Sequence, residues 1–212
     1  MLVSWINLLL LFFSLAFFAG FYIPSLQPAR RAETAGNKAW KQCKTLRTIG
    51  TIFMVVALIT IFLWIWLPIP ELAWSIHSDP WIGSILAVII FIITFPIWLK
   101  GLKDSGPESI TPSPNTKMFR GIYQYIRHPQ TLGEISWFIA LPLLVNSFFL
   151  LIVTTIFLLF YTPTMLYVEE RDLIRRFGDA YREYKEQTGA LFPKFRKAET
   201  EPNRESNRSQ SH

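Results

Sequence analysis

The chain has 212 residues, of which 51% are hydrophobic and 17% are charged, and its formal net charge at pH 7 is +6. Acidic and basic residues are absent from four long apolar segments: 2–23, 49–67, 81–99 and 148–168. Because roughly 20 helical residues cross the ~30 Å hydrocarbon layer, this distribution excludes an ordinary soluble domain and predicts an all-α integral membrane protein.

The first apolar segment, 2–23, is interpreted as a transmembrane helix rather than a signal peptide. No basic region precedes it, its apolar stretch is too long, and no A-x-A cleavage site follows it. The spans 49–67 and 81–99 come next, separated by a short loop with three prolines. The segment 103–117 is rich in Pro and Ser and is predicted to be a loop without regular structure.

A shorter apolar segment, 132–147, leads directly into the span 148–168. We therefore predict a fifth transmembrane helix and a C-terminal helical hairpin that turns near Asn146 and Ser147. Glu134 stands at the start of the shorter helix. It is interpreted as a carboxylate that favours the positive end of a helix dipole.

After the last span, 169–187 is predicted to form a cytoplasmic amphipathic helix. One face is apolar, and the other pairs Asp172 with Arg176 at a spacing of four residues. Residues 1–197 are interpreted as a single membrane domain. The tail, 198–212, lacks large apolar residues and is expected to be disordered.

The positions of the basic residues predict the orientation in the membrane. With five spans, all 21 Lys and Arg residues fall on one side, in the segments 24–48, 100–131 and from 169 onward. Cytoplasmic loops carry such an excess, so the N-terminus is expected outside and the C-terminus in the cytoplasm. The membrane would be a prokaryotic plasma membrane or the endoplasmic reticulum. The net charge then requires no nucleic acid as a partner.

Cys43 is the only cysteine, so an intrachain disulfide is impossible. We find no cluster of His and Cys residues with the spacing of metal ligands, and no metal is expected.

Ionisable residues stand at the cytoplasmic ends of both hairpin helices. Arg127 and His128 precede the first helix, and Glu169 and Glu170 follow the second. Antiparallel neighbours joined by a tight turn have their open ends side by side, so we expect these side chains to meet. Charged groups at membrane depth are costly, and such a cluster should either neutralise itself or bind a polar ligand. Taken singly, each could instead be an interfacial or helix-end residue.

Two stretches, YQYIRHPQTLGE and EERDLIRRFGDAYREYKEQTGALFPKF, resemble the C-terminal half of the isoprenylcysteine carboxyl methyltransferase family. That family belongs with the wider group of membrane-embedded phospholipid and thiol methyltransferases. The resemblance covers about residues 120–195. Many relatives have an aromatic residue at the position of Thr131, and this departure leaves the identity of the acceptor more open than the chemistry.

The resemblance implies S-adenosylmethionine as cofactor, held in a pocket that faces the cytoplasm, and an acceptor that enters from the lipid bilayer. A prenylcysteine-like carboxylate or another lipid-borne group is the expected acceptor. The expected catalytic residues are Arg127, Glu170 and Tyr125: Arg127 to place a carboxylate, and the other two to accept a proton where the acceptor carries one. The residues expected to bind the cofactor are His128, Pro129, Leu132, Gly133, Glu169 and Glu170.

Other functions stay open. A small thiol or a phospholipid amine could be the acceptor, and either must lose a proton. A sterol-reductase-like oxidoreductase that uses NADPH shares a related Arg-His-Pro and terminal Tyr pattern, although such chains generally have more spans. A membrane protein that has only the scaffold, without activity, is the third alternative.

Overall fold

The computed structural model describes residues 1–113 and 120–194, which are helical apart from loops and two isolated bridges. The tail predicted to be disordered, 198–212, lies outside these residues. Five longer helices are present: α1 (Leu2–Ser25), α3 (Lys38–Leu63), α4 (Pro80–Ser105), α5 (Pro129–Leu144) and α6 (Phe148–Phe177). Shorter elements join or flank them: α2 (Pro28–Ala35), α7 (Asp179–Gln187) and the 3-10 turns η1 (Pro70–Leu72), η2 (Gly106–Ser109) and η3 (Gly121–Gln124).

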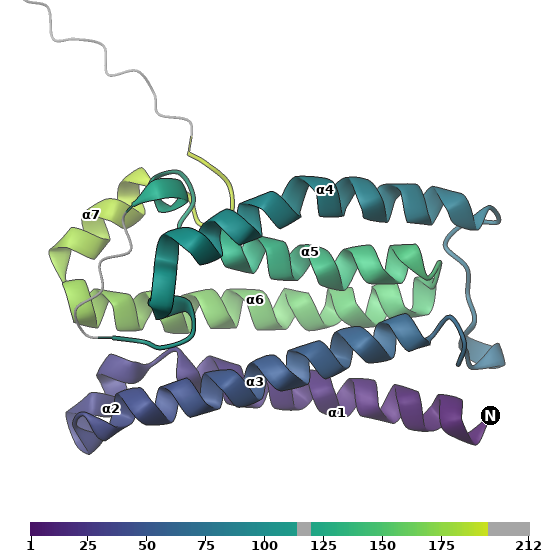
Figure 1. The fold of residues 1–212 in the computed structure, drawn as a ribbon, viewed down its shortest axis with the longest axis horizontal. Coiled ribbons are helices and arrows are strands. Elements are labelled where there is room, and N and C mark those ends of the chain that lie inside the picture. The colour runs from purple at the N-terminus through teal and green to yellow at the C-terminus, as the bar shows by residue number, and fades with distance from the viewer. Residues whose placement is uncertain (114–119, 195–212) are drawn as a thin grey trace, which may run out of the picture.

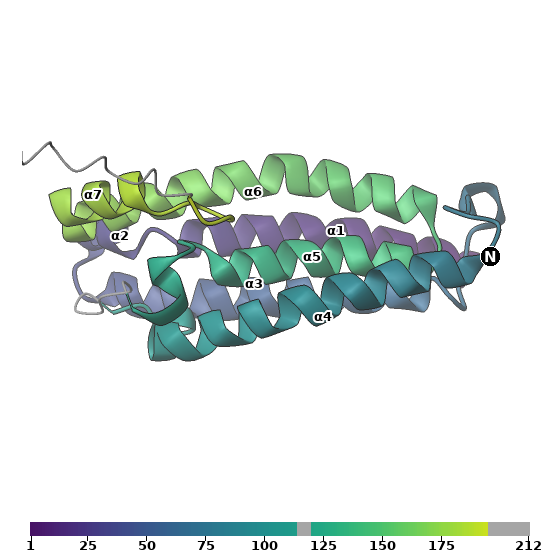
Figure 2. The same cartoon turned by 90° about the horizontal axis from the view of Figure 1, so that it is seen from above.

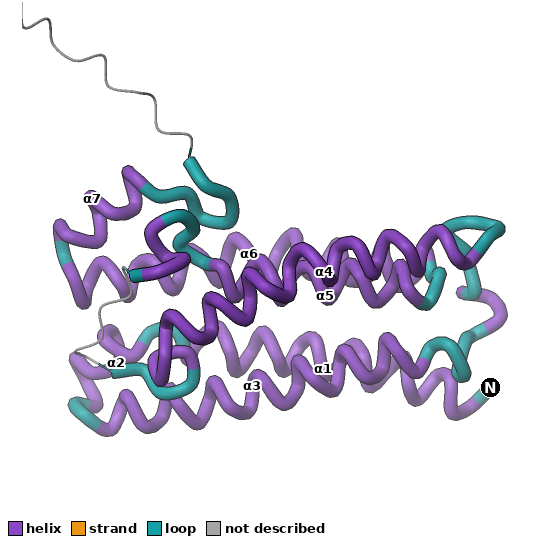
Figure 3. The backbone as a smooth tube through the Cα atoms, turned by 45° about the horizontal axis from the view of Figure 1, so that its top comes forward, coloured by secondary structure: helices purple, strands orange, loops and turns teal. Residues whose placement is uncertain are grey.

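The five longer helices run along a common axis (Figure 1). α1 packs on α3, α4 packs on α5, and α5 packs on α6; contacts of α1 with α6 and of α3 with α5 join the two groups (Figure 2). The N-terminus lies at one end of the bundle, together with the loop that joins α5 to α6. α2 and α7 lie at the opposite end (Figure 3). That second end holds the candidate site.

Large apolar side chains fill the space between α1, α5 and α6. Phe18, Phe138 and Leu150 are almost fully buried there. The ring of Phe18 lies 4.8 Å from that of Tyr161 and 6.2 Å from that of Phe138, measured between centroids. Each such side chain contributes about 1.5–3 kcal/mol when buried in a water-soluble fold, and in lipid close packing takes over that role.

Four helices are long and apolar enough to cross a membrane, namely α1, α3, α6 and the helix that begins at Pro80. Their outward surfaces carry exposed Ile, Leu, Val and Phe side chains, such as Ile92 and Phe160. A surface this apolar needs lipid around it, and the protein is an integral membrane protein. α5 has only 16 residues, about 24 Å of helix. The crossing by α5, and with it the five-span topology, stays a prediction.

The α5–α6 connection is a three-residue turn at 145–147. Asn146 has a positive φ of 50°, and its side-chain oxygen accepts hydrogen bonds from the backbone N–H groups of Ile76 and His77, both at 3.2 Å. Ser147 caps α6 by accepting from the N–H of Leu150 at 3.3 Å. These bonds fix the turn to the loop between α3 and α4.

The boundary predicted at 168/169 is wrong. α6 continues without a break to Phe177, because Glu169, Glu170 and the residues after them are all compatible with a helix. Gly178 ends it with φ 60°, a left-handed conformation that favours glycine, and the surface helix is the separate α7. The Pro- and Ser-rich segment also differs from prediction, because 103–105 belongs to α4 and 106–109 forms η2.

Candidate active site

The backbone of the Arg-His-Pro segment is held by the C-terminal end of the described chain. The N–H of Arg127 donates to the carbonyl of Gly189 at 2.9 Å, and the N–H of His128 donates to the carbonyl of Ala190 at 3.0 Å. Pro129 then begins α5, where its missing N–H has no cost. Residues 188–190 therefore lie across the entry to α5.

Arg127 is fully engaged as a cross-link between α6 and the end of α7. Its Nε and Nη2 atoms lie 2.9 and 2.7 Å from Oε1 of Glu170. Its Nη1 atom donates to the carbonyls of Lys185, at 3.0 Å, and Thr188. The side chain is 8% exposed. A buried guanidinium with these four contacts holds α6, the end of α7 and the entry to α5 together.

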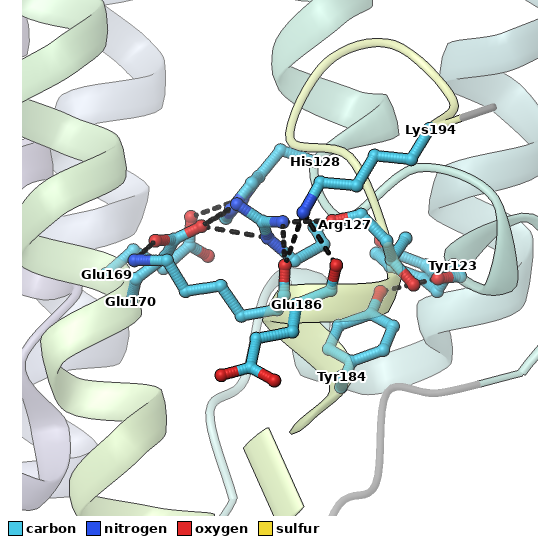
Figure 4. Close-up of polar contacts among 10 residues, drawn as sticks. Tyr123, Arg127, His128, Glu169, Glu170, Tyr184, Glu186 and Lys194 are labelled. Atoms are coloured by element: carbon cyan, nitrogen blue, oxygen red, sulfur yellow. Dashed lines mark hydrogen bonds and ion pairs between the residues drawn. The ribbon is translucent and has the colours of Figure 1, made fainter. Parts of the chain in front are cut away.

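Glu170 is surrounded by cations (Figure 4). Besides Arg127, its carboxylate receives Nζ of Lys185 at 2.6 Å and Nε2 of His128 at 3.3 Å. A carboxylate with three positive partners is a poor proton acceptor, because each partner stabilises its ionised form. In this structure Glu170 therefore holds the side chains of Arg127, His128 and Lys185 together.

His128 bridges the two adjacent glutamates of α6. Its Nδ1 atom lies 3.0 Å from Oε2 of Glu169, on the other side of the ring from Glu170. Burial alone would lower the pKa of His128, but the carboxylates of Glu169 and Glu170 outweigh this and raise it to about 9. The ring is thus a buried cation at neutral pH, and the predicted meeting of Arg127 and His128 with the two glutamates is found.

A cavity opens beside this cluster, at the α2 and α7 end of the bundle. It is bounded by side chains of α1, α3, α4, α5 and α6, and Arg127, His128 and Glu169 line it. The space between atoms is about 730 Å³ including the open mouth, whereas the centre of a water molecule can reach only about 70 Å³ of it. A nucleoside-sized ligand therefore requires the walls to separate.

Two arginines from distant elements line the same cavity. Arg47 of α3 donates through Nη1 to the carbonyls of Glu108 and Ser109, at 2.9 and 3.1 Å. Nη2 of Arg176 on α6 lies 2.9 Å from Oε1 of Glu108, and that side chain is 7% exposed. The Nε atoms of Arg47 and Arg176 are buried and have no hydrogen-bond partner among residues 1–113 and 120–194. Both side chains therefore have donor capacity left for an anionic group.

A polar cluster joins α4, α5 and the two turns at the rim. The amide nitrogen of Gln130 lies 2.8 and 2.7 Å from the hydroxyls of Ser105 and Ser109 and 3.0 Å from that of Tyr123. Burial raises the pKa of Tyr123 to about 12, so its phenol is neutral at physiological pH. The neighbouring Tyr184 donates to the backbone carbonyl of Tyr123 (Figure 4). This cluster holds α4, α5, η2 and η3 together at the rim of the cavity.

Asp172 and Arg176 do not form the predicted surface pair. Both side chains turn inward: Asp172 accepts from the N–H groups of Ala29 and Arg30, at 3.2 and 2.9 Å, and so caps α2. Arg176 pairs with Glu108 instead. A spacing of four residues places two side chains on the same face of a helix, but it does not tell whether that face meets solvent or the protein interior.

The remaining predicted site residues lie outside the cavity. Tyr125 is 65% exposed and does not line the cavity, so its expected catalytic role is not supported. Gly133 faces α4, where an added Cβ would lie 2.4 Å from Cβ of Trp98. Pro129 packs against Gly101 of the same helix. Leu132 and Glu170 are also absent from the cavity lining. Pro129 and Gly133 therefore serve close helix packing.

Several lining residues were not singled out from the sequence. Tyr22 lies inside the apolar segment 2–23 and Arg47 is one of several basic residues in 24–48, so neither pattern marks them. Glu108 falls in the segment expected to be irregular. Glu134 was assigned to the helix dipole, yet it is the sixth residue of α5, beyond the first turn, and it lines the cavity.

Comparison with known proteins bears on this site. Residues 82–180, which include the Arg-His-Pro segment and both glutamates, match the family described as phospholipid methyltransferase. The chain is related to the membrane phospholipid and thiol methyltransferases. It is 33% identical over 168 residues to methanethiol S-methyltransferase 1 of Bradyrhizobium diazoefficiens, which covers 69% of this chain and 54% of that protein.

Two further relatives of this methyltransferase group are informative. Methanethiol S-methyltransferase of Pseudomonas deceptionensis is 29% identical over 154 residues, covering 67% of this chain and 57% of that protein. Protein-S-isoprenylcysteine O-methyltransferase of Schizosaccharomyces pombe is 29% identical over 73 residues, 34% of this chain and 31% of that protein. The chain spans about half the length of the first two relatives. No solved structure matches. The predicted resemblance is confirmed, and these names do not favour a reductase.

Proposed function

We propose that the protein catalyses methyl transfer from S-adenosylmethionine to an acceptor that reaches the cavity at the α2 and α7 end of the bundle. The observation that carries this proposal is the cavity itself. Its walls combine arginines, carboxylates and a buried imidazolium, and most of its lining residues, among them Arg127, His128 and Glu169, come from the segment that matches the phospholipid methyltransferase family. The names of the relatives support the same class of reaction.

The chemistry of the walls suits the charged end of this cofactor. Its carboxylate would bind Arg47 and Arg176, whose buried Nε atoms have no partner in the described part of the chain. Its adenosine would lie toward His128 and Tyr123, whose flat rings also line the cavity. When bound, S-adenosylmethionine supplies a methyl group on a positively charged sulfur. The protein contributes alignment and exclusion of water, which accelerate such a displacement.

The position of the site within the membrane follows from the basic residues. Described Lys and Arg residues lie at the α2 and α7 end of the bundle, and the N-terminal end carries none, because 1–29, 48–99 and 128–170 contain no Lys or Arg. This asymmetry supports a site on the cytoplasmic side of the membrane and an N-terminus on the opposite side. It also supports five spans, with α5 as a short crossing helix. A mapping of introduced cysteines with an impermeant thiol reagent tests this topology: Ser75 would react from outside and Ser113 only after permeabilisation.

Two acceptor classes fit the relatives' names, a small thiol and a prenylcysteine-like carboxylate. The walls must already separate to admit the cofactor, and a small thiol needs less additional space than a prenyl chain. A lipid-borne carboxylate would have to enter between helices, and it would need no proton acceptor. The acceptor therefore decides which wall residues take part in the chemistry.

The test is an acceptor panel with purified protein in detergent and radiolabelled S-adenosylmethionine. Ethanethiol, a farnesylcysteine analogue and phosphatidylethanolamine are offered separately, and labelled product is counted. Label in the ethanethiol product supports the thiol acceptor, and label in farnesylcysteine supports the lipid-borne acceptor. Absence of labelled product from every acceptor, together with absence of cofactor binding, contradicts the proposal.

A further inference from the structure

Five carboxylates stand at or beside the cavity, and four of them already have partners. Glu169 and Glu170 bind His128, and Glu170 also binds Arg127 and Lys185. Glu108 binds Arg176 and accepts from the N–H of Ser113 at 2.9 Å; Asp172 caps α2. Glu134 differs from all four. Within residues 1–113 and 120–194, its carboxylate has neither an ion pair nor a hydrogen bond, although the residue is half-buried and lines the cavity.

No structural role within the described residues accounts for a carboxylate at position 134. It stands beyond the first turn of α5, too far for a useful interaction with the helix dipole. It caps no helix and neutralises no adjacent cation by direct contact among the described residues. Placing an unpaired carboxylate in a partly dry site is costly, and such groups are often found where a proton must be taken up.

We propose that Glu134 is the catalytic base that takes the proton from a thiol acceptor during methyl transfer. This inference rests on the proposed function. The thiol S–H proton passes to a carboxylate oxygen of Glu134 while the sulfur lone pair forms a bond to the methyl carbon. The bond between that carbon and the donor sulfonium breaks, and its electron pair stays on the donor sulfur, which leaves neutral S-adenosylhomocysteine and a thioether. Glu134 afterwards releases the proton to water.

The position of Glu134 fits this task better than that of Glu170. A base must lie within hydrogen-bond reach of the group it deprotonates, and Glu134 faces the open space of the cavity. The apolar side chains of Met165 and Leu173 line the same cavity and would surround a small alkyl thiol. Alkyl thiols are mostly protonated at pH 7, so a base is worth more to them than to acceptors that are already ionised.

The experiment compares Glu134→Gln with the wild-type protein, using ethanethiol and thiophenol as acceptors. The glutamine variant has nearly the same shape but cannot take a proton. We expect its turnover of ethanethiol at pH 7 to fall by about 100-fold or more, the usual range for a general base. Thiophenol is largely ionised at this pH, so its turnover is expected to fall by less than about tenfold. Glu71→Gln, an exposed carboxylate at the other end of the bundle, is the matched control and should match wild type.

Binding of S-adenosylhomocysteine, measured by calorimetry, separates the base from other roles. The variant should bind it within about threefold of wild type. A large loss of that affinity would show that Glu134 holds the cofactor, and equal losses for both thiols, or none, would also overturn the inference. If the wild-type protein labels only farnesylcysteine, the proposal that Glu134 deprotonates a thiol acceptor fails, whereas the proposed methyltransferase function is supported. If wild type binds no cofactor, the proposed function fails as well.

Discussion

Arg127 and Glu170 are 43 positions apart in the chain, yet two nitrogens of the arginine lie 2.7 and 2.9 Å from a single carboxylate oxygen of the glutamate. The same guanidinium reaches two backbone carbonyls at the end of α7. One side chain therefore joins the start of α5, the C-terminal part of α6 and the segment that follows α7.

Replacement of Arg127 by alanine is expected to destabilise the protein strongly. The change leaves Glu170 buried with fewer cations, and removal of one partner from a buried pair typically costs about 3–5 kcal/mol. Thermal unfolding in detergent measures the loss. Arg182→Ala is the matched control, since its ion pair with Asp179 is exposed, and it should change stability by less than about 1 kcal/mol. Equal stability of the two variants would show that the Arg127 junction does not hold the fold.

Alkaline pH is expected to weaken the fold through His128. Its folded pKa of about 9 lies above the ordinary value of about 6.5, so its stabilising effect is complete below pH 6.5 and is lost as pH rises through 9. Between pH 7 and 9 the loss amounts to about 2 kcal/mol. Unfolding measured across this range should show the decline in wild type. His128→Gln should be less stable at pH 7 and show a flatter profile; an unchanged slope in that variant would exclude His128 as its source.

Gly133→Ala tests whether this glycine serves packing or cofactor binding. An added Cβ would lie 2.4 Å from Cβ of Trp98, so α4 and α5 must move apart, at a cost of roughly 1–3 kcal/mol. Gly20→Ala is the control, because nothing lies within 4 Å of its added Cβ and alanine favours a helix. We expect lower thermal stability for Gly133→Ala and similar cofactor affinity per folded molecule. If Gly133→Ala is as stable as wild type but binds the cofactor less tightly, Gly133 contributes to cofactor binding, as the resemblance implied.

Arg176→Gln is expected to weaken S-adenosylhomocysteine binding by about tenfold or more, because a charged hydrogen bond to the cofactor carboxylate is lost. The neighbouring Arg175→Gln is the control: Arg175 is partly exposed and its nearest acid is Glu33, at 3.6 Å. Calorimetric titration of both variants gives the affinities, and unfolding without ligand corrects for the lost contact with Glu108. Equal affinities for the two variants would remove Arg176 from the anion site.

The apolar segments and the Arg-His-Pro and Glu-Glu positions predicted much of this arrangement. Spans could be located because the absence of charge over ~20 residues has a direct physical meaning in a membrane. The meeting of His128 with Glu169 followed from the tight turn near Asn146. Helix ends were harder: α6 continues past Glu170 because charged residues do not stop a helix, and only Gly178 does.

Polar residues that face the interior were the hardest feature to predict from the sequence. Asp172 and Arg176 have the spacing of a solvated surface pair, and Tyr22 and Arg47 carry no local signal of their partners. Asp172 meets α2, and Arg47 and Arg176 meet η2, through tertiary packing rather than through spacing along the chain. Tyr125 and Tyr123 are two residues apart in an irregular segment, where sequence alone does not tell which side chain turns inward.

Thermal unfolding of the purified protein in detergent with S-adenosylhomocysteine, and in parallel with NADPH, tests the central claim most directly. A ligand that binds only the folded state at about 100 times its Kd stabilises that state by about 2.7 kcal/mol. We predict a rise in the unfolding temperature with S-adenosylhomocysteine and no change with NADPH. Stabilisation by NADPH alone, or by neither ligand, would contradict a methyl-donor site between His128, Arg47 and Arg176.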